Sequence, residues 1–301
     1  MSQAAAGRAR AAFLRACELD VAVRKPGNVS LASPGHGMQA AQFRASARAA
    51  AGPLFELGAR VGPRIEAAQA ASWAACGCNT NLGILLLCAP LALAIECQAG
   101  AGSVAELRQA VAEVLAGLDL DDSRAAFRAI AAARPGGLGR TGAEDVHLPP
   151  SLDLRAAMAL AAGRDSIARQ YSDGYAGVFE IGLPALLAGG RGLEAATAAG
   201  QPDTADVQRL FLTLLGAAPD SHIVRKHGPD VAQTVMRAAQ AWQVDLARRG
   251  VDRPALDEDP AFLAWDEGLK REGKVDQASA AAKDTVNKAA DAIKNAVNPK
   301  E

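Results

Sequence analysis

Alanine-rich stretches recur along almost the whole chain, whereas the alternation of β-branched and aromatic residues that marks β-strands is nearly absent. Alanine has the highest intrinsic helix propensity of all residues, and aromatic side chains make up only 4% of this sequence. With 301 residues, of which 50% are hydrophobic, the chain can bury a substantial core. We therefore predict an all-α fold, built as a single compact domain of about eleven helices.

Local signals mark where many of these helices begin and end. Ser103-Val104-Ala105-Glu106 has the form of a capping box. Pro63 and Pro229 suit the first turn of a helix, and Gly250 suits a helix stop. The predicted helices span residues 3–22, 38–60, 63–76, 82–98, 104–118, 123–133, 152–163, 165–188, 204–217, 230–249 and 260–272.

Glycine and proline concentrate in residues 134–150, which predicts a long loop in the middle of the chain. Such a loop is either a linker between two helical halves or an active-site flap within one domain. We place it inside one catalytic domain over residues 1–273. Residues 274–301 are rich in alanine, lysine, aspartate and asparagine, and they predict an amphipathic or disordered tail.

Charge and cysteine content exclude several classes of protein. The 32 lysines and arginines against 33 aspartates and glutamates give a net charge of −1, which predicts no nucleic-acid or membrane partner. The five cysteines form no C-x-x-C pair, so we read them as small apolar residues of a reducing cytoplasm. The longest apolar run, from Leu82 to Ile95, is too short to span a bilayer and contains Pro90, so we expect a buried helix there.

Three polar segments stand out against this apolar background. In the first polar segment, residues 24–37, Lys25-Pro26-Gly27 has the residue types of a type II turn. Such a turn exposes backbone N–H groups beside two cations and can receive phosphate oxygens. Asn28, Ser30 and His36 in the same segment favour a functional site over an ordinary turn between helices.

The second polar segment, residues 77–83, comes directly before the most apolar predicted helix. A helix needs one N-cap residue, but Asn79, Thr80 and Asn81 stand here in a row between two glycines. A helix N-terminus with spare amide and hydroxyl groups suits an anion or a metal ion bound to phosphate.

The third polar segment, residues 220–229, holds two of the four histidines, His222 and His227, beside two cations. Arg225 suits a bidentate contact to phosphate, Lys226 adds a point charge, and Asp220 suits a magnesium ion. A solvated loop between two helices explains the same residues equally well.

Other charged residues are less informative. Asp165 and Arg169 are spaced one helical turn apart, which predicts a surface ion pair. Glu144, Asp145 and His147 in the glycine-rich loop are ambiguous. No Walker A pattern, no G-x-G-x-x-G after a strand, no H-E-x-x-H and no G-x-S-x-G occurs, so the common nucleotide folds do not explain the polar segments.

Together, Lys25-Pro26-Gly27 with His36, Asn79-Thr80-Asn81-Leu82-Gly83 and Asp220-Ser221-His222 resemble the triphosphoribosyl-dephospho-coenzyme A synthase family. The similarity extends roughly from Phe13 to Ala239. The resemblance implies an all-helical, ATP-binding transferase that moves the 5-triphosphoribosyl group of ATP to the ribose 2′-hydroxyl of dephospho-coenzyme A and releases adenine. The product is the precursor of the prosthetic group of citrate lyase and malonate decarboxylase.

The resemblance also implies roles for individual residues. It assigns proton transfer to His36 or His222. The triphosphate would lie against phosphate-binding residues, and magnesium would be held directly or through water. The expected ATP-binding residues are Lys25, Gly27, Asn28, Thr80, Arg225 and Lys226, and the expected magnesium ligands are Glu18, Asn79, Asn81 and Asp220.

The sequence departs from the family pattern in two places. Asn28, Ser30 and Gly37 stand where the family has other residues, and the block from Asn79 to Gly83 lacks a histidine and a cation. These changes resemble a divergent branch of archaea and methylotrophic bacteria, for which a one-carbon cofactor of the tetrahydromethanopterin type is the alternative context. A helical nucleotide-binding or interaction protein without catalysis is the third hypothesis. The oligomeric state, including a homodimer, stays open.

Overall fold

A computed structural model describes residues 3–35, 37–98, 103–136, 138–188, 204–251 and 256–271. Within these ranges every regular element is a helix, which confirms the predicted all-α class. The predicted tail over 274–301 lies outside them. The helices are α1 (Gln3–Ala22), α2 (Ala40–Leu54), α3 (Val61–Cys76), α4 (Leu82–Cys97), α5 (Val104–Ala116), α6 (Leu120–Ala133), α7 (Leu154–Ala161), α8 (Ser166–Asp173), η1 (Gly177–Gly182), α9 (Leu183–Leu187), α11 (Thr204–Ala217), α12 (Ser221–His227), α13 (Pro229–Arg248) and η2 (Leu256–Glu258), followed by helical residues 260–271.

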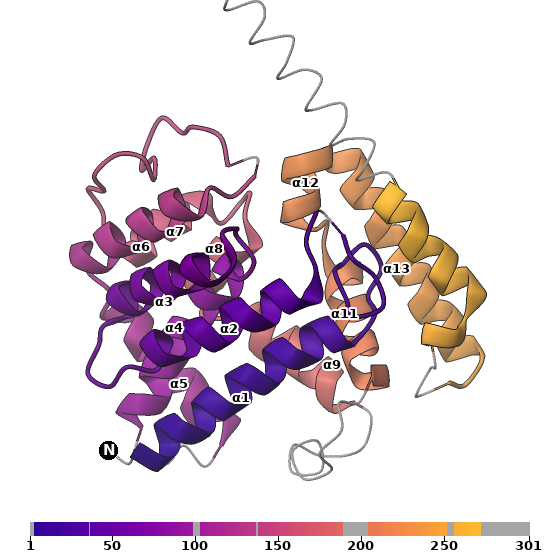
Figure 1. Ribbon diagram of the computed structural model, residues 1–301, viewed down its shortest axis with the longest axis horizontal. Helices are drawn as coiled ribbons and strands as arrows, with labels where there is room; N and C mark the ends of the chain where they lie inside the picture. The colour runs from indigo at the N-terminus through magenta and orange to yellow at the C-terminus, as the bar shows by residue number, and fades with distance from the viewer. Residues whose placement is uncertain are drawn as a thin grey trace, which may run out of the picture.

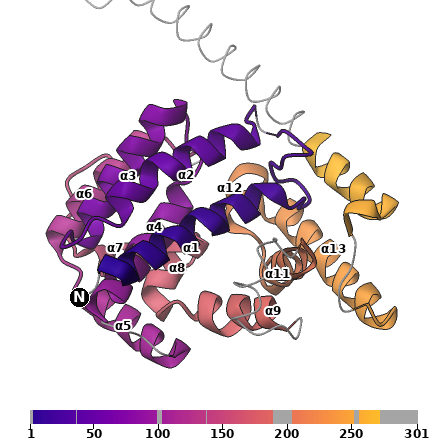
Figure 2. The same cartoon turned by 60° about the horizontal axis from the view of Figure 1, so that its bottom comes forward.

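Two hydrophobic clusters organise these helices. The N-terminal core gathers buried residues of α1 to α8 and η1, from Phe13 to Phe179. The C-terminal core joins α11, α13, η2 and residues 260–271, and its members are Leu212, Leu215, Val235, Ala239, Leu246, Leu256 and Phe262. In both ribbon views α1 runs from the helices of the N-terminal core toward α11 (Figures 1 and 2).

Small residues let the helices of the N-terminal core approach closely. Ala50, Ala51 and Ala68 are fully buried. Gly62, at the start of α3, lies so close to α6 that an added Cβ would sit 2.5 Å from the Cα of Asp122. Alanine and glycine here serve packing as well as helix propensity, because any larger side chain would push the two helices apart.

Helix α4 has buried residues from Leu82 to Ala94, as its apolar run predicts, and Pro90 lies inside it. Proline has no N–H, so the carbonyl of Leu86 loses its regular helical donor. The Tyr171 hydroxyl donates to that oxygen at 2.6 Å. The buried Tyr171 therefore satisfies a carbonyl that the helix itself leaves unpaired.

Several predicted boundaries are confirmed, and one predicted helix is wrong. The helices over 3–22 and 204–217 match α1 and α11, and the capping box at Ser103 is present. The helix predicted over 165–188 is broken, because Gly174 and Tyr175 take left-handed backbone conformations with φ of 67° and 63°. A second helix then begins with the π-helical turn η1.

Two further corrections concern helix ends. Helix α2 stops at Leu54, six residues before the predicted end, and the chain turns through Gly58 at a φ of 77°. Residues 221–227, predicted as a loop, form helix α12 with Asp220 as its N-cap.

None of the described helices has the length and apolar character needed to cross a membrane. The five cysteines are free. Burial raises the pKa of the Cys17 and Cys88 thiols to about 12, so both behave as apolar groups of the core.

Tyr171→Phe should lower the free energy of unfolding by about 1 to 3 kcal/mol, because the Leu86 carbonyl would be buried without a donor. Tyr175→Phe is the matched control: its hydroxyl donates to Leu87 at 2.9 Å, a carbonyl whose helical donor, the Leu91 amide, is present. Chemical denaturation of the two variants checks this difference. Equal losses would show that Pro90 creates no special demand.

Candidate functional site

The first polar segment forms the predicted turn. The Asn28 amide donates to the Lys25 carbonyl at 3.0 Å, and Gly27 takes a φ of 79°, as a type II turn requires. The Asn28 side chain is exposed at the tip. Ser30 and Ser33 then exchange two backbone hydrogen bonds of 2.8 and 3.1 Å, which closes a second tight turn.

Lys25 lies almost buried at the base of this turn, with 4% of its surface exposed. Its ammonium donates to the Asp20 carbonyl at 2.7 Å and to the Asp20 carboxylate. Since an ammonium has three N–H groups, one donor stays available beyond these two bonds. A distant part of the chain also fixes the turn, because the Gly27 amide donates to Asp266 of the C-terminal helix at 3.0 Å.

The second polar segment serves partly as a joint between helices α4 and α2. The Thr80 hydroxyl and the Asn81 amide both bond to the Ser46 hydroxyl, at 2.7 and 2.8 Å. Asn81 occupies the N-cap position of α4, but its side chain caps no backbone amide. Asn79 supplies the capping oxygen instead, accepting from the Leu82 amide at 3.4 Å.

The third polar segment is organised by Asp220, whose Oδ1 accepts from the His222 and Ile223 amides at 2.8 and 2.9 Å. Both bonds use one oxygen, and within the described residues Oδ2 receives none. His222 is exposed, and its Nδ1 lies 2.8 Å from Nη2 of Arg225. Because a guanidinium only donates, Nδ1 accepts and the neutral ring carries its proton on Nε2.

Arg225 is the most constrained cation of α12. Its Nε donates to the Gly136 carbonyl at 3.0 Å, and Nη1 donates to Asp165 at 3.1 Å. With the bond to His222, three of its five N–H groups are used. The expected Asp165–Arg169 ion pair is therefore wrong: Asp165 pairs with Arg225, while Arg169 donates to the Ala162 carbonyl at 3.1 Å.

Lys226 follows Arg225 and lies against the glycine-rich loop. A Cβ on Gly136 would be 3.6 Å from Cε of Lys226. Lys226 is exposed, and partial desolvation, together with the neighbouring Arg225, lowers its pKa. The described residues of the loop over 134–150 thus contact α12 in the C-terminal half.

The start of helix α8 brings the second and third polar segments together. Gly83 of the second segment lies close to Ile167, since a Cβ there would be 3.5 Å from the isoleucine side chain. At the preceding residue of α8, the Ser221 hydroxyl bonds to the Ser166 amide and hydroxyl at 3.0 and 2.9 Å. The first segment precedes α2 in the chain, and Ser46 of α2 bonds to Thr80 of the second segment.

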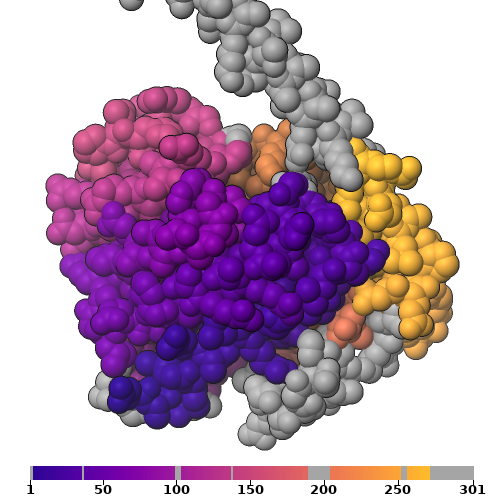
Figure 3. All heavy atoms as spheres, in the orientation of Figure 1, coloured from indigo at the N-terminus to yellow at the C-terminus, as the bar shows by residue number. Residues whose placement is uncertain are grey.

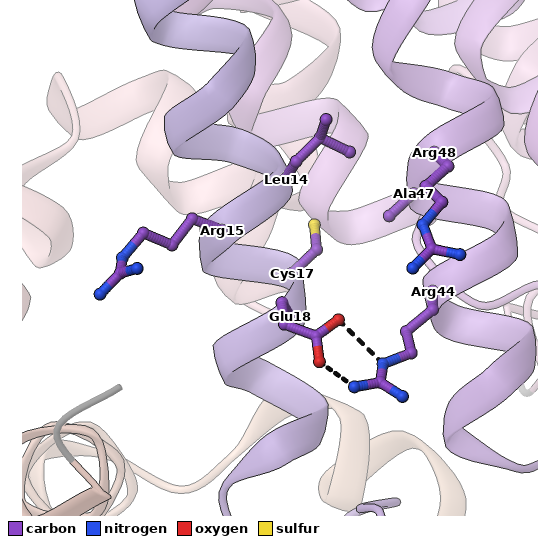
Figure 4. Close-up of a pocket in the computed structure, with 7 residues that line it drawn as sticks. All are labelled: Leu14, Arg15, Cys17, Glu18, Arg44, Ala47 and Arg48. Atoms are coloured by element: carbon purple, nitrogen blue, oxygen red, sulfur yellow. Dashed lines mark hydrogen bonds and ion pairs between the residues drawn. The ribbon is translucent and has the colours of Figure 1, made fainter. Parts of the chain in front are cut away.

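Glu18 lies apart from these segments, in a pocket of about 270 Å³ between α1 and α2 (Figure 4). Its carboxylate forms two hydrogen bonds with Arg44, one of them 2.8 Å from Nε. These bonds lower the pKa of Glu18. Arg44 and Arg48 face the same space in the close-up. Glu18 therefore already neutralises a cation, and holding a metal would require Arg44 to release it.

The remaining candidate residues lie in the first polar segment and in the glycine-rich loop. His36 lies outside the described residues. Asp145 shapes the glycine-rich loop: hydrogen bonds from the backbone amides of His147 and Thr141 lower its pKa. Glu144 holds Ser151 through the serine hydroxyl at 2.6 Å. In the described part of the chain, no three acidic, histidine or cysteine side chains gather closely enough to hold a metal ion by themselves.

Sequence reasoning missed three residues that hold the segments in place: Ser46, Asp165 as the partner of Arg225, and Asp266. The first and third contact the polar segments across 34 to 242 residues of sequence. Aspartate directly before Ser166 is a visible N-cap signal for α8, but nothing local marks the other two.

Comparison with known proteins gives a family. Among curated proteins, none matches the chain. A protein of Archaeoglobus fulgidus that carries the name triphosphoribosyl-dephospho-coA synthase has a similar crystal structure, with a TM-score of 0.50 and 21% sequence identity over 78% of this chain and 97% of its own. That likeness shows the fold.

The sequence profile of the ATP:dephospho-CoA triphosphoribosyl transferases matches residues 6–282 and so covers most of the chain, including the three polar segments. The predicted resemblance is confirmed. The chain belongs to the ATP:dephospho-CoA triphosphoribosyl transferase family, and its reaction is the transfer of the triphosphoribosyl group of ATP to dephospho-CoA.

Proposed function

We propose that the triphosphate of ATP binds between the turn at Lys25 and helix α12, with the glycine-rich loop beside it. The observation that carries this placement is the fixed position of Arg225, which bonds to the glycine-rich loop, to the start of α8 and to His222. Within the described residues, two of its five N–H groups stay open for phosphate oxygens. Lys226 adds a second cation on the same helix.

The first polar segment supplies the other side of this site. Lys25 keeps one ammonium donor beyond its bonds to Asp20. The Ser30 hydroxyl is buried without a partner among the described residues, a state that costs free energy and that a bound phosphate group would relieve. Asn28 is exposed at the tip of the turn and completes this set.

A magnesium ion would arrive with ATP. Magnesium in nucleotide sites takes most of its ligands from phosphate and water and only one or two from the protein. Oδ2 of Asp220 fits that demand, and Oδ1 of Asn79 keeps a second lone pair beyond its 3.4 Å bond from the Leu82 amide, whereas Asn81 and Thr80 are occupied with Ser46. We assign Asp220 and Asn79 as the magnesium ligands. The ion would neutralise phosphate charge.

The reaction is a substitution at the anomeric carbon of the ribose. The bond from this carbon to the adenine nitrogen breaks, its electron pair leaves with adenine, and a bond to the 2′-oxygen of the acceptor forms. The acceptor hydroxyl loses one proton and adenine gains one, so the step balances. His222 and His36 are the candidates for these two proton transfers, and the histidine that protonates adenine would act from its imidazolium form and be left neutral.

Adenine release from ATP tests the function directly. The protein should release adenine only when dephospho-CoA is present, and mass spectrometry should find dephospho-CoA enlarged by one triphosphoribosyl group. Release of adenine with a tetrahydromethanopterin-type precursor and not with dephospho-CoA would contradict the proposed acceptor. Absence of release with either compound would contradict catalysis.

Arg225→Lys should lower kcat/KM for ATP by about tenfold to a hundredfold, because lysine cannot keep the three fixing contacts and still offer two donors to phosphate. Arg237→Lys, an exposed arginine on α13, is the matched control and should leave the rate unchanged. Steady-state kinetics with varied ATP checks the pair. Equal rates for both variants would remove Arg225 from the site.

Asp220→Asn should raise the magnesium concentration needed for half-maximal rate by about tenfold, because the amide keeps the helix cap but loses the charge on Oδ2. Magnesium titration at saturating ATP measures this, and circular dichroism confirms that α12 is retained. Asp153 is the N-cap of α7, and Asp153→Asn is the control for loss of a charge at a helix cap. A shift of equal size in both variants would contradict the assigned ligand.

A further inference from the structure

The helical residues 260–271 lie against the first polar segment, although the two are at opposite ends of the sequence. The space-filling view shows the first part of the chain and the C-terminal helix in contact across one face (Figure 3). No motif in the sequence marks this helix as functional. Its contacts, however, concentrate on the turn proposed to meet the triphosphate.

Asp266 makes the central contact, and its side chain is fully buried. Oδ1 accepts from the Gly27 amide at 3.0 Å. Oδ2 accepts from Lys270 at 2.7 Å and from Arg24 at 3.4 Å. A buried carboxylate is costly unless donors surround it, so this arrangement is stable only while the turn keeps its observed orientation.

Lys270 extends the contact to a second point of the segment. It is 7% exposed and donates to the Ser33 hydroxyl as well as to Asp266. Ser33 is paired by backbone hydrogen bonds with Ser30, whose hydroxyl is the buried group without a partner. The helix therefore forms hydrogen bonds with the segment on both sides of Asn28, at Gly27 and at Ser33.

The helix can hold the segment because it is itself fixed. Phe262 and Trp265 pack on Trp242 of α13, with ring centroids 5.5 and 6.5 Å apart. Leu269 packs against the turn, since a Cβ at Gly27 would lie 3.5 Å from the Leu269 side chain. The turn thus has a rigid support.

We propose that Asp266 and Lys270 are positioning residues that hold the first polar segment in the conformation that receives the triphosphate of ATP. This inference rests on the proposed function of that segment. Two cations, Arg24 and Lys270, share one carboxylate here, so the cluster keeps a net positive charge beside the turn. That sign favours a polyanion.

The test compares Asp266→Asn with the wild-type enzyme in steady-state kinetics. Asparagine keeps an acceptor for the Gly27 amide but removes the charge that orders Arg24 and Lys270. KM for ATP should rise by about tenfold, while KM for dephospho-CoA and kcat should change by less than about threefold, because a preorganised site loses affinity when its loop loosens.

Asp259→Ala separates positioning from stability. Asp259 caps the same helix through the Ala261 amide at 2.9 Å and touches no residue of the turn in the described contacts. Its loss should lower the melting temperature and leave KM for ATP unchanged. If both variants raise KM equally at equal loss of stability, the role of Asp266 is structural only and the proposal is wrong.

Variants of Lys270 provide an independent test if Asp266→Asn does not fold. Lys270→Met should raise KM for ATP, and Lys270→Arg, which keeps the charge and the donors, should restore most of it. An unchanged KM in Lys270→Met would overturn the positioning role.

Hydrogen exchange of residues 24–33 distinguishes this proposal from the proposed function. ATP should slow their exchange in the wild-type protein and do so less in Asp266→Asn. If ATP does not protect them in the wild type, the proposed ATP site is wrong. If it protects both proteins equally at equal affinity, only the positioning role is wrong.

Discussion

A buried carboxylate joins the two hydrophobic clusters of this protein. Asp266 belongs to the helix that packs on α13, yet its hydrogen bonds go to Gly27 and Arg24, directly after α1. Because an unpaired charge in an apolar interior is strongly unfavourable, the C-terminal helix and the first polar segment must come together with both sets of donors in place. The position of the turn at Lys25 is thus set by the fold as a whole.

The other two polar segments depend on similar long-range contacts. Ser46 on α2 receives Thr80 and Asn81, and Asp165 at the start of α8 receives Arg225. The first contact pairs Thr80 and Asn81 with a buried hydroxyl, and the second pairs the Arg225 guanidinium with a carboxylate. Triphosphoribosyl transfer requires a fixed triphosphate and two proton transfers, and a preorganised set of donors supplies the first of these.

Local chemistry predicted much of the fold. Alanine-rich periodicity placed α1 and α11, the capping box located α5, and Pro26-Gly27 predicted the type II turn. Sequence failed where a distant group decided the outcome. Asn81 looked like an ordinary N-cap, but its side chain turns to a serine 35 residues earlier. At the break, Tyr175 takes a left-handed backbone conformation with its ring buried in the N-terminal core, and α12 is too short to show a period. The position of Asp266 could not be inferred, since its partner amide is 239 residues away.

We infer that the turn at Lys25 and helix α12 enclose the triphosphate. A crystal structure of the protein with magnesium and a non-hydrolysable ATP analogue tests it most directly. We predict phosphate oxygens within hydrogen-bonding distance of Arg225 and of the segment from Lys25 to Ser30, with magnesium beside Asp220. A nucleotide bound instead in the pocket between α1 and α2, against Arg44 and Arg48, would contradict the account.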